Sequence, residues 1–302
     1  MTNPTKKIFV PTDDLEKHGL ATSCIRVFTV PILNVLPSSI IKKMMRKSSR
    51  DASDVIASSG STHALEVMYT HSFRKFSRWT PKGIANTFWH TVVAQPKALR
   101  NRLKITRSAI DHNISLLIKE RGQQNDINPI RVLSIAGGSS RATIQVVSDL
   151  KRNGIHQDIE VITLDKDQSA LDIGKQLAED AGVSSCFNWI CGNAHDVSTL
   201  VPNKRFDIVE IVGLLDYFDD ERVIRLMKSA RDVMYQNGII VAANVMPNPE
   251  APFVYKMGWP EMVYRTHENF SILFEKSGFT KAETIIEPLK VHCVIIAKNE
   301  HN

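Results

Sequence analysis

A glycine-containing turn, and an acidic residue 27 positions after its last glycine, have the residue types that bind a nucleotide-like ligand. The turn reads SIAGGSSRATI from Ser134 to Ile144 and follows a short apolar stretch. Gly137 and Gly138 bring no side chain where a ligand would pass the backbone, and the helix expected next offers free N–H groups. Asp165 ends the stretch EVITLD, where a carboxylate can accept hydrogen bonds from both hydroxyls of a ribose. An Asp that caps the following helix is the alternative.

The elements around these residues alternate between apolar stretches and helical patterns. This alternation predicts an α/β fold, a Rossmann-like mostly parallel sheet flanked by helices. The last two strands fit an antiparallel hairpin at the sheet edge. We expect strands at 131–136, 160–164, 188–191, 206–212, 238–243, 281–286 and 292–297. We expect helices near 141–152, 168–181, 221–235 and 266–277.

The front of the chain differs in pattern and in charge. Helical spacing occurs at 54–69, 84–93 and 98–120, with Pro81 and Pro96 as breaks. Residues 1–125 carry 20 Lys and Arg against 8 Asp and Glu, whereas residues 126–302 carry 18 against 24. A polar stretch at 121–129 has the composition of a linker. These features predict a helical accessory or lid region over 1–125 and a ligand-binding domain over 126–302.

Residues 131–244 resemble the class I methyltransferases that depend on S-adenosylmethionine (SAM). The resemblance is carried by the glycine turn, by Asp165, by CGNAHD from Cys191 to Asp196, and by FDIVEIVGLLDYF after it. It implies SAM as the cofactor, with the methionine part at the turn, the ribose at the acid, the adenine after the third strand and the sulfonium beside a later glycine. The implied SAM-binding residues are Ala136, Gly137, Gly138, Asp165, Lys166, Asn193, Ala194 and Gly213.

Four positions depart from the pattern of that family. Ser134 stands where the first strand usually has an acid, Ala136 replaces the first glycine and Ser140 the third. Asn193 replaces the common Asp, and its carbonyl can still accept a hydrogen bond from the adenine amino group.

A narrower resemblance covers roughly residues 205–279. GLLDYFDDE, ANVMPNPE and MGWPEMVYRT are similar to bacterial proteins assigned to 3-hydroxypalmitic acid methyl ester biosynthesis. This resemblance implies methylation of a carboxylate on a fatty-acid-like molecule or another acidic metabolite. The matched positions are Asp216, Tyr217, Asn244, Trp259, Tyr264 and Arg265.

Methyl transfer is an in-line displacement, which a protein accelerates by holding the acceptor atom about 3 Å from the methyl carbon and by excluding water. A carboxylate acceptor is ionised at neutral pH and needs no base. Arg265 is then the candidate partner of the carboxylate, with Glu261 as its alternative partner on a surface turn. The expected substrate-binding residues are Tyr217, Asn244, Trp259, Tyr264 and Arg265, although the aromatic side chains also fit an ordinary core.

A hydroxyl or amine acceptor would need a base. The candidate catalytic residues are then Asp216, Tyr217, His195 and His267. We find no cluster with metal-ligand spacing and expect no metal.

The basic front half leaves several partners open. HSFRKFSRW at 71–79 interleaves aromatic and basic residues, as a nucleic-acid surface does, but no known RNA-binding module is present. IIKKMMRKSSR at 40–50 has the composition of a helix that contacts an anionic membrane. A solvated helical face is the plainer interpretation. A small acidic or lipid-like substrate is favoured over nucleic acid, and the sequence predicts no oligomeric state.

Two further functions share the same motifs. An NAD-dependent oxidoreductase also uses a glycine turn and a ribose-binding acid, and a methyltransferase-like scaffold without activity would tolerate Ser134 and Ala136. The start of the sequence lacks the apolar core of a secretory signal, so a cytoplasmic location is expected.

Overall fold

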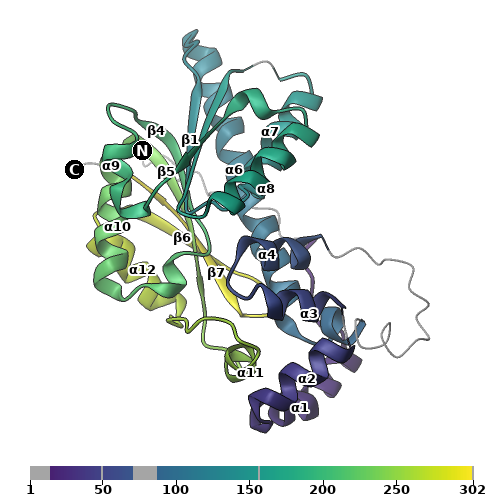
Figure 1. Cartoon of the computed structure of the whole chain (residues 1–302). Helices are drawn as coiled ribbons and strands as arrows, with labels where there is room; N and C mark the ends of the chain where they lie inside the picture. Colours follow the sequence, from purple (N-terminus) through teal and green to yellow (C-terminus); the bar gives the residue numbers. More distant parts are fainter. Residues whose placement is uncertain (1–13, 49, 71–86, 156, 301–302) are drawn as a thin grey trace.

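The computed structural model describes residues 14–48, 50–70, 87–155 and 157–300. At its centre lies a seven-stranded sheet in the order β3-β2-β1-β4-β5-β7-β6 (Figure 1). The strands are β1 (Ile130–Ile135), β2 (Ile159–Asp165), β3 (Phe187–Cys191), β4 (Phe206–Ile211), β5 (Met234–Val245), β6 (Thr280–Ile286) and β7 (His292–Lys298). Strands β1 to β5 are parallel, and β7 runs antiparallel to β5 and β6. The predicted α/β fold with an antiparallel edge pair is confirmed.

The strand order reverses between β1 and β4, which lie side by side in the sheet. In open α/β sheets a ligand binds beyond the carboxyl ends of the strands at such a point. The loops that follow β1 and β4 therefore face the expected site.

Helices cover both faces of the sheet. One face packs against α9 (Val197–Leu200), α10 (Asp220–Asp232) and α12 (His267–Lys276). The other packs against α6 (Ala94–Gln124), α7 (Arg141–Arg152) and α8 (Gln168–Asp180). The remaining helices gather at one end of the molecule in Figure 1 and share a separate apolar cluster. They are α1 (Leu20–Val35), α2 (Ser38–Ser48), α3 (Arg50–Ala57), α4 (Thr62–Tyr69) and α11 (Ala251–Lys256).

The N-terminal helices differ from the prediction in their limits. The helix expected at 54–69 is divided into α3 and α4 by a turn in which Gly60 has a φ of 79°. The helix expected from 98 begins at Ala94, so Pro96 does not break it. Pro96 lies in the first turn of α6, where a backbone N–H has no acceptor within the helix and its loss costs nothing. Pro81 and the first part of the helix expected at 84–93 lie outside the described residues.

The long helix α6 belongs to the core of the sheet. Ile105, Ala109, Ile110 and Ile114 are buried in one cluster with residues of β1 and α7. This helix also continues to Gln124, through the first part of the expected linker. The apolar core therefore crosses the expected boundary between residues 125 and 126, whereas α1–α4 pack as a separate layer.

Replacing Ile110 by Ala tests this packing. The side chain is fully buried, and a cavity of that size in a core lowers the free energy of unfolding by about 2–5 kcal/mol. Ile127→Ala is the control, because this side chain is 91% exposed and its loss changes stability by less than about 0.5 kcal/mol. Denaturant titration measures both, and equally small effects would show that α6 is not part of the core.

Candidate functional site

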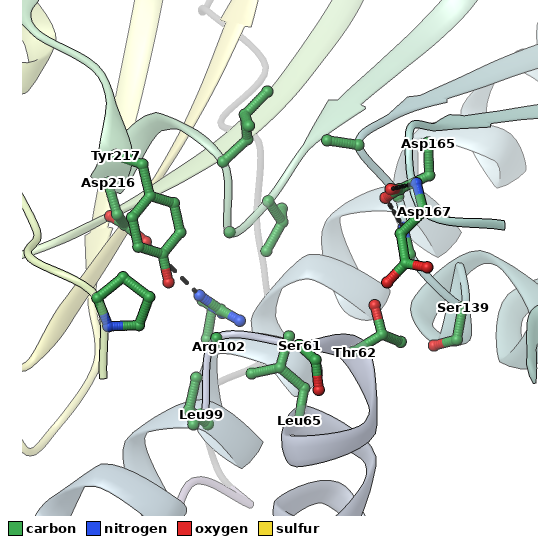
Figure 2. Close-up of a pocket in the computed structure, with 18 of the residues that line it drawn as sticks. Ser61, Thr62, Leu65, Leu99, Arg102, Ser139, Asp165, Asp167, Asp216 and Tyr217 are labelled. Atoms are coloured by element: carbon green, nitrogen blue, oxygen red, sulfur yellow. Dashed lines mark hydrogen bonds and ion pairs between the residues drawn. The ribbon is translucent and has the colours of Figure 1, made fainter. Parts of the chain in front are cut away.

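A cavity of about 480 Å³ lies at the carboxyl edge of the parallel strands. The loops after β1, β2, β3 and β4 form one side of it, and residues of α3, α4 and α6 form the other. Small-molecule sites typically have volumes of about 300–1,000 Å³. Figure 2 shows Asp165 and Asp167 at one end of this cavity and Asp216 and Tyr217 at the other.

All eight residues that the resemblance implies for SAM line this one cavity. They are Ala136, Gly137, Gly138, Asp165, Lys166, Asn193, Ala194 and Gly213. These residues come from the end of β2 and from the loops after β1, β2, β3 and β4. They lie close together because these four parallel strands are neighbours in the sheet.

The glycine turn has a left-handed backbone at three positions. Ala136, Gly138 and Ser140 have φ values of 50°, 53° and 49°. Non-glycine residues tolerate this conformation at a cost of about 1–2 kcal/mol, so the turn keeps its shape although Ala and Ser replace two expected glycines. A Cβ on Gly137 would lie 2.3 Å from the Ser134 Oγ, and this position has no room for a side chain.

Asp165 faces the cavity and does not cap the next helix. Its Oδ2 accepts a hydrogen bond from the Gly138 N–H at 2.8 Å, and its Oδ1 accepts one from the Asp167 N–H at 2.9 Å. The cap of α8 is Asp167, which accepts from the Ser169 N–H. A carboxylate has about four acceptor positions, so Asp165 keeps capacity for two ligand hydroxyls while its orientation is fixed. The helix-cap alternative for Asp165 is therefore wrong.

The acid that is missing from β1 is supplied by the neighbouring strand. Glu210 on β4 pairs in register with Ser134 and accepts hydrogen bonds from Ser134 Oγ and Thr143 Oγ1, both at 3.0 Å. Both bonds end on Oε2, and Glu210 lines the cavity. Burial raises the pKa of this carboxyl although both hydrogen bonds oppose the shift.

The other end of the cavity contains the buried Arg102, which is not among the site residues predicted from the sequence. Arg102 projects from α6 toward Asp216 and Tyr217 (Figure 2). Its Nη2 donates to the Tyr69 hydroxyl at 3.1 Å, and its Nη1 lies 4.0 Å from Asp216 Oδ2. Burial opposes the charge of Arg102, but attraction to Tyr69 and Asp216 outweighs it and raises the pKa of the guanidinium. Asp216 also accepts from the Val245 N–H, and burial raises its pKa.

Several polar atoms of residues that line the cavity are buried without a partner among the described residues. These atoms are Arg102 Nε, Thr106 Oγ1, Gln95 Nε2, Trp89 Nε1 and both ring nitrogens of His292, and all five residues line the cavity. An unpaired buried polar atom costs about 1–3 kcal/mol. These unpaired atoms indicate that the cavity accommodates a polar ligand group.

Tyr217 and Trp259, two of the residues expected to bind the substrate, line the cavity and contact each other. The Trp259 Nε1–H donates to the Tyr217 hydroxyl oxygen at 2.9 Å, which leaves the Tyr217 O–H available as a donor. Burial raises the pKa of Tyr217 to about 12, so the phenol keeps its proton at neutral pH and is no base. The His195 ring also lines the cavity and stacks on Phe218 at 5.3 Å.

Four predicted residues are not among those that line the cavity, namely Asn244, Tyr264, Arg265 and His267. Arg265 is buried and donates to the Leu215 and Phe218 carbonyls, to Asn244 Oδ1 at 2.9 Å and to Asp220 Oδ1 at 2.8 Å. Its guanidinium thus fixes the loop after β4, and it pairs with Asp220 where Glu261 was the expected alternative.

The other three have local roles. The Asn244 amide donates to the Val245 and Val263 carbonyls. Tyr264 packs with Val245 and Val291, and His267 pairs with Glu268 at 3.1 Å. These contacts support the loops around the cavity from outside.

The spacing of residues along α6 is a sequence signal for those lining residues, including Arg102, that were not predicted on this helix. Gln95, Leu99, Arg102, Leu103 and Thr106 recur at the spacing of one helix face, and all line the cavity. A basic residue among the apolar residues of such a face is rarely buried unless it has a partner. For His292 and Glu210, no comparable local signal exists, because each lies within an apolar strand.

The N-terminal helices close the cavity over the glycine turn. Glu66 of α4 accepts from Ser139 Oγ at 2.6 Å and from Arg141 Nε at 2.7 Å. A Cβ on Gly138 would lie 2.8 Å from Thr62 Oγ1, so the start of α4 lies directly against the turn. Among the described residues, no group of three His, Cys, Asp or Glu side chains is placed to hold a metal ion.

Comparison with known proteins agrees with this geometry. Residues 132–238 match the family model of a methyltransferase domain. This segment contains the glycine turn, Asp165, Asn193 and Gly213, which all line the cavity. Residues 132–238 form a methyltransferase domain. No curated protein sequence matches the chain.

Solved structures share the fold of this methyltransferase at low sequence identity. A protein from Bordetella parapertussis described as a possible exported protein is 17% identical, with 78% of each chain covered and a TM-score of 0.59. The CurJ carbon methyltransferase is 14% identical over 88% of this chain and 72% of its own, with a TM-score of 0.53. The CMeT domain of the citrinin polyketide synthase is 12% identical over 80% of this chain and 66% of its own, with a TM-score of 0.52.

Removing the Arg265 side chain is expected to destabilise the methyltransferase. Arg265→Ala leaves the Leu215 carbonyl and Asn244 Oδ1 without this donor, and each unpaired buried group costs about 1–3 kcal/mol. We expect a loss of about 3 kcal/mol in the free energy of unfolding, measured by denaturant titration. Arg225→Ala on the exposed face of α10 is the control, with an expected change below about 0.5 kcal/mol. Unchanged stability together with lost turnover would instead place Arg265 in acceptor binding.

Proposed function

We propose that this methyltransferase transfers the methyl group of SAM to an acidic small molecule, and that the favoured acceptor is a carboxylate on a fatty-acid-like chain. The observation that carries the proposal is a single cavity with the loops that would bind SAM at one end and the buried Arg102 at the other.

The cofactor end fits SAM by shape and by charge. Gly137 and Gly138 of the turn line the cavity, and the Asp165 carboxylate would bind the ribose hydroxyls. Asn193 and Ala194 would contact the adenine. Glu210 would attract the ammonium of the methionine part, because its carboxylate is held beside the turn by Ser134 and Thr143. SAM, when bound, supplies a methyl carbon that is activated by the sulfonium.

The acceptor end fits an anion. Arg102 is buried, and a buried guanidinium attracts an anion much more strongly than an exposed one does. Its Nε has no partner among the described residues, and the Tyr217 O–H is a second donor. An ionised carboxylate needs no base, so these groups would act by orienting the acceptor oxygen and by keeping water out.

The wall between the N-terminal helices and α11 fits an alkyl chain. It is apolar and consists of Val55, Leu65, Met68, Leu99, Val254, Met257 and Met262. This wall supports the proposal that the acceptor carries a fatty-acid-like chain.

A hydroxyl acceptor is the second candidate, and His292 favours it. Burial, together with repulsion from Arg102, lowers the pKa of His292 well below 6.5, so the ring is neutral at pH 7. Neither ring nitrogen has a partner among the described residues. A neutral imidazole in this position would accept the proton of a hydroxyl acceptor.

Asp165→Ala tests the cofactor end. Loss of the ribose contacts should weaken SAM binding at least tenfold, or about 1.4 kcal/mol, in calorimetric titration. Asp172→Ala, an exposed carboxylate on α8, should bind SAM like the native protein. Native protein that binds NAD and not SAM would overturn the proposal, and so would an Asp165→Ala variant that is folded and has full SAM affinity.

Replacement of Arg102 tests the acceptor end. We expect Arg102→Met to raise the KM of a carboxylate acceptor at least tenfold and to leave the Kd of SAM within twofold. The Arg102→Met variant also carries Asp216→Asn, because loss of Arg102 alone would leave the buried Asp216 carboxylate without its ion-pair partner. The side-chain oxygen of the Asn can still accept a hydrogen bond from the Val245 N–H.

Arg222→Met is the matched control, because this second lining arginine lies over the Phe218 ring at 4.1 Å. Arg102→Lys should recover part of the affinity, since it restores charge without the planar fork. An unchanged KM in the Arg102→Met variant would exclude Arg102 as the anion-binding residue.

A further inference from the structure

Helix α1 exposes an unbroken apolar face. Leu20, Phe28 and Val35 are 90%, 72% and 77% exposed. Successive residues of an α-helix are rotated by about 100° around the helix axis. Viewed along the axis of α1, these three side chains lie within one sector of about 160°, together with other residues of the helix. Every residue in that sector is apolar, namely Leu20, Ala21, Cys24, Ile25, Val27, Phe28, Pro31, Ile32 and Val35.

The opposite face of α1 is firmly attached to the protein. Val30 and Leu33 are buried, and Arg26 forms an ion pair with the buried Glu250. The Asn34 amide donates to the Pro249 carbonyl at 2.7 Å. The exposed face is therefore held in a fixed position outside the protein core.

The next helix adds positive charge. Between Leu20 and Ser48 the sequence has five basic residues and no acidic one. Four of them, Lys42, Lys43, Arg46 and Lys47, lie on α2 and have no ion-pair partner within the part of the chain that the structure describes. The exposed side chains of Ile40 and Met44 lie one helical turn from Lys43 and Lys47 on the same side of α2. An apolar face beside uncompensated cations is typical of helices that lie in a membrane interface.

We propose that the exposed faces of α1 and α2 form a docking surface for a membrane with anionic lipids. The apolar side chains of α1 would enter the headgroup region, and the basic residues of α2 would be attracted to the anionic headgroups. A second copy of the chain fits this surface less well, because pairing through α1 would bring two sets of α2 cations together. None of the described helices is long and apolar enough to cross a membrane, so the contact lies along the surface.

This surface is adjacent to the cavity. Both α1 and α2 pack against α11, and Val254 of α11 and Met257, which follows this helix, line the cavity wall. A membrane-bound orientation would therefore place the apolar wall near the lipids. Only this consequence, delivery of a lipid-like acceptor, rests on the proposed function.

Co-sedimentation of the full chain with vesicles tests the docking surface. We expect binding to phosphatidylcholine vesicles with 30% phosphatidylglycerol, a composition chosen for the test, and at least tenfold weaker binding to pure phosphatidylcholine or at high salt. Phe28→Ser/Val35→Ser and Lys43→Glu/Lys47→Glu should each reduce the partition coefficient at least tenfold. Lys119→Glu/Lys228→Glu, an equal change of charge on other helices, should leave it within twofold.

SAM titration on the same variants separates this proposal from the function. The α1 and α2 variants should keep native SAM affinity, which shows that they are folded, whether or not a carboxylate is the acceptor. Equal binding of native protein to neutral and anionic vesicles would overturn the proposal, as would no binding to either. Sedimentation velocity that shows a dimer lost in Phe28→Ser/Val35→Ser would assign the face to a second copy instead.

Discussion

A positive charge held out of water is the constraint on which the proposed chemistry depends. The guanidinium of Arg102 lies in the cavity, and within the part of the chain that the structure describes its ion-pair partner is Asp216, whose nearest oxygen is 4.0 Å away. A buried cation of this kind is costly unless its remaining donors find partners. The anchoring of α6 in the core of the sheet keeps that charge in position, and an anionic acceptor group would complete its coordination.

The two ends of the cavity have different physical origins. The cofactor end is built from backbone geometry, since the left-handed turn at residues 136–140 and the loop positions after β2, β3 and β4 follow from the parallel sheet. The acceptor end is built from side chains on α6, β7 and the loop after β4, and these come from distant parts of the chain. Helix α4 covers the first end and is held there by Glu66 through Ser139 and Arg141.

This difference explains what could be predicted from the sequence. The strands, the turn and Asp165 leave local signals, namely apolar stretches, glycines and an acid at a fixed separation. Glu210 is recognisable only once β4 is known to pair with β1, because only then does it stand beside Ser134. Arg265 was selected for the acceptor because an arginine in a sequence does not reveal its partner. In the structure, the Arg265 guanidinium donates hydrogen bonds to backbone carbonyls of the loop after β4. Arg102, and not Arg265, lines the cavity.

The accessory region shows the same limit. Helical spacing predicts helices where α3, α4 and α6 lie, but it does not show that α6 completes the sheet while α1–α4 form a separate layer beside α11. That distinction depends on which apolar faces meet in space. Helix α1 has no predicted counterpart, and one of its apolar faces is exposed.

The central claim is that the acceptor is an anion, and it is tested most directly by offering one alkyl chain with three head groups. A 16-carbon acid, its primary amide and its alcohol would be incubated separately with the protein and SAM carrying a labelled methyl group. The account predicts a labelled methyl ester from the acid and at least a hundredfold less product from the other two. Methylation of the alcohol at a rate equal to that of the acid would contradict it.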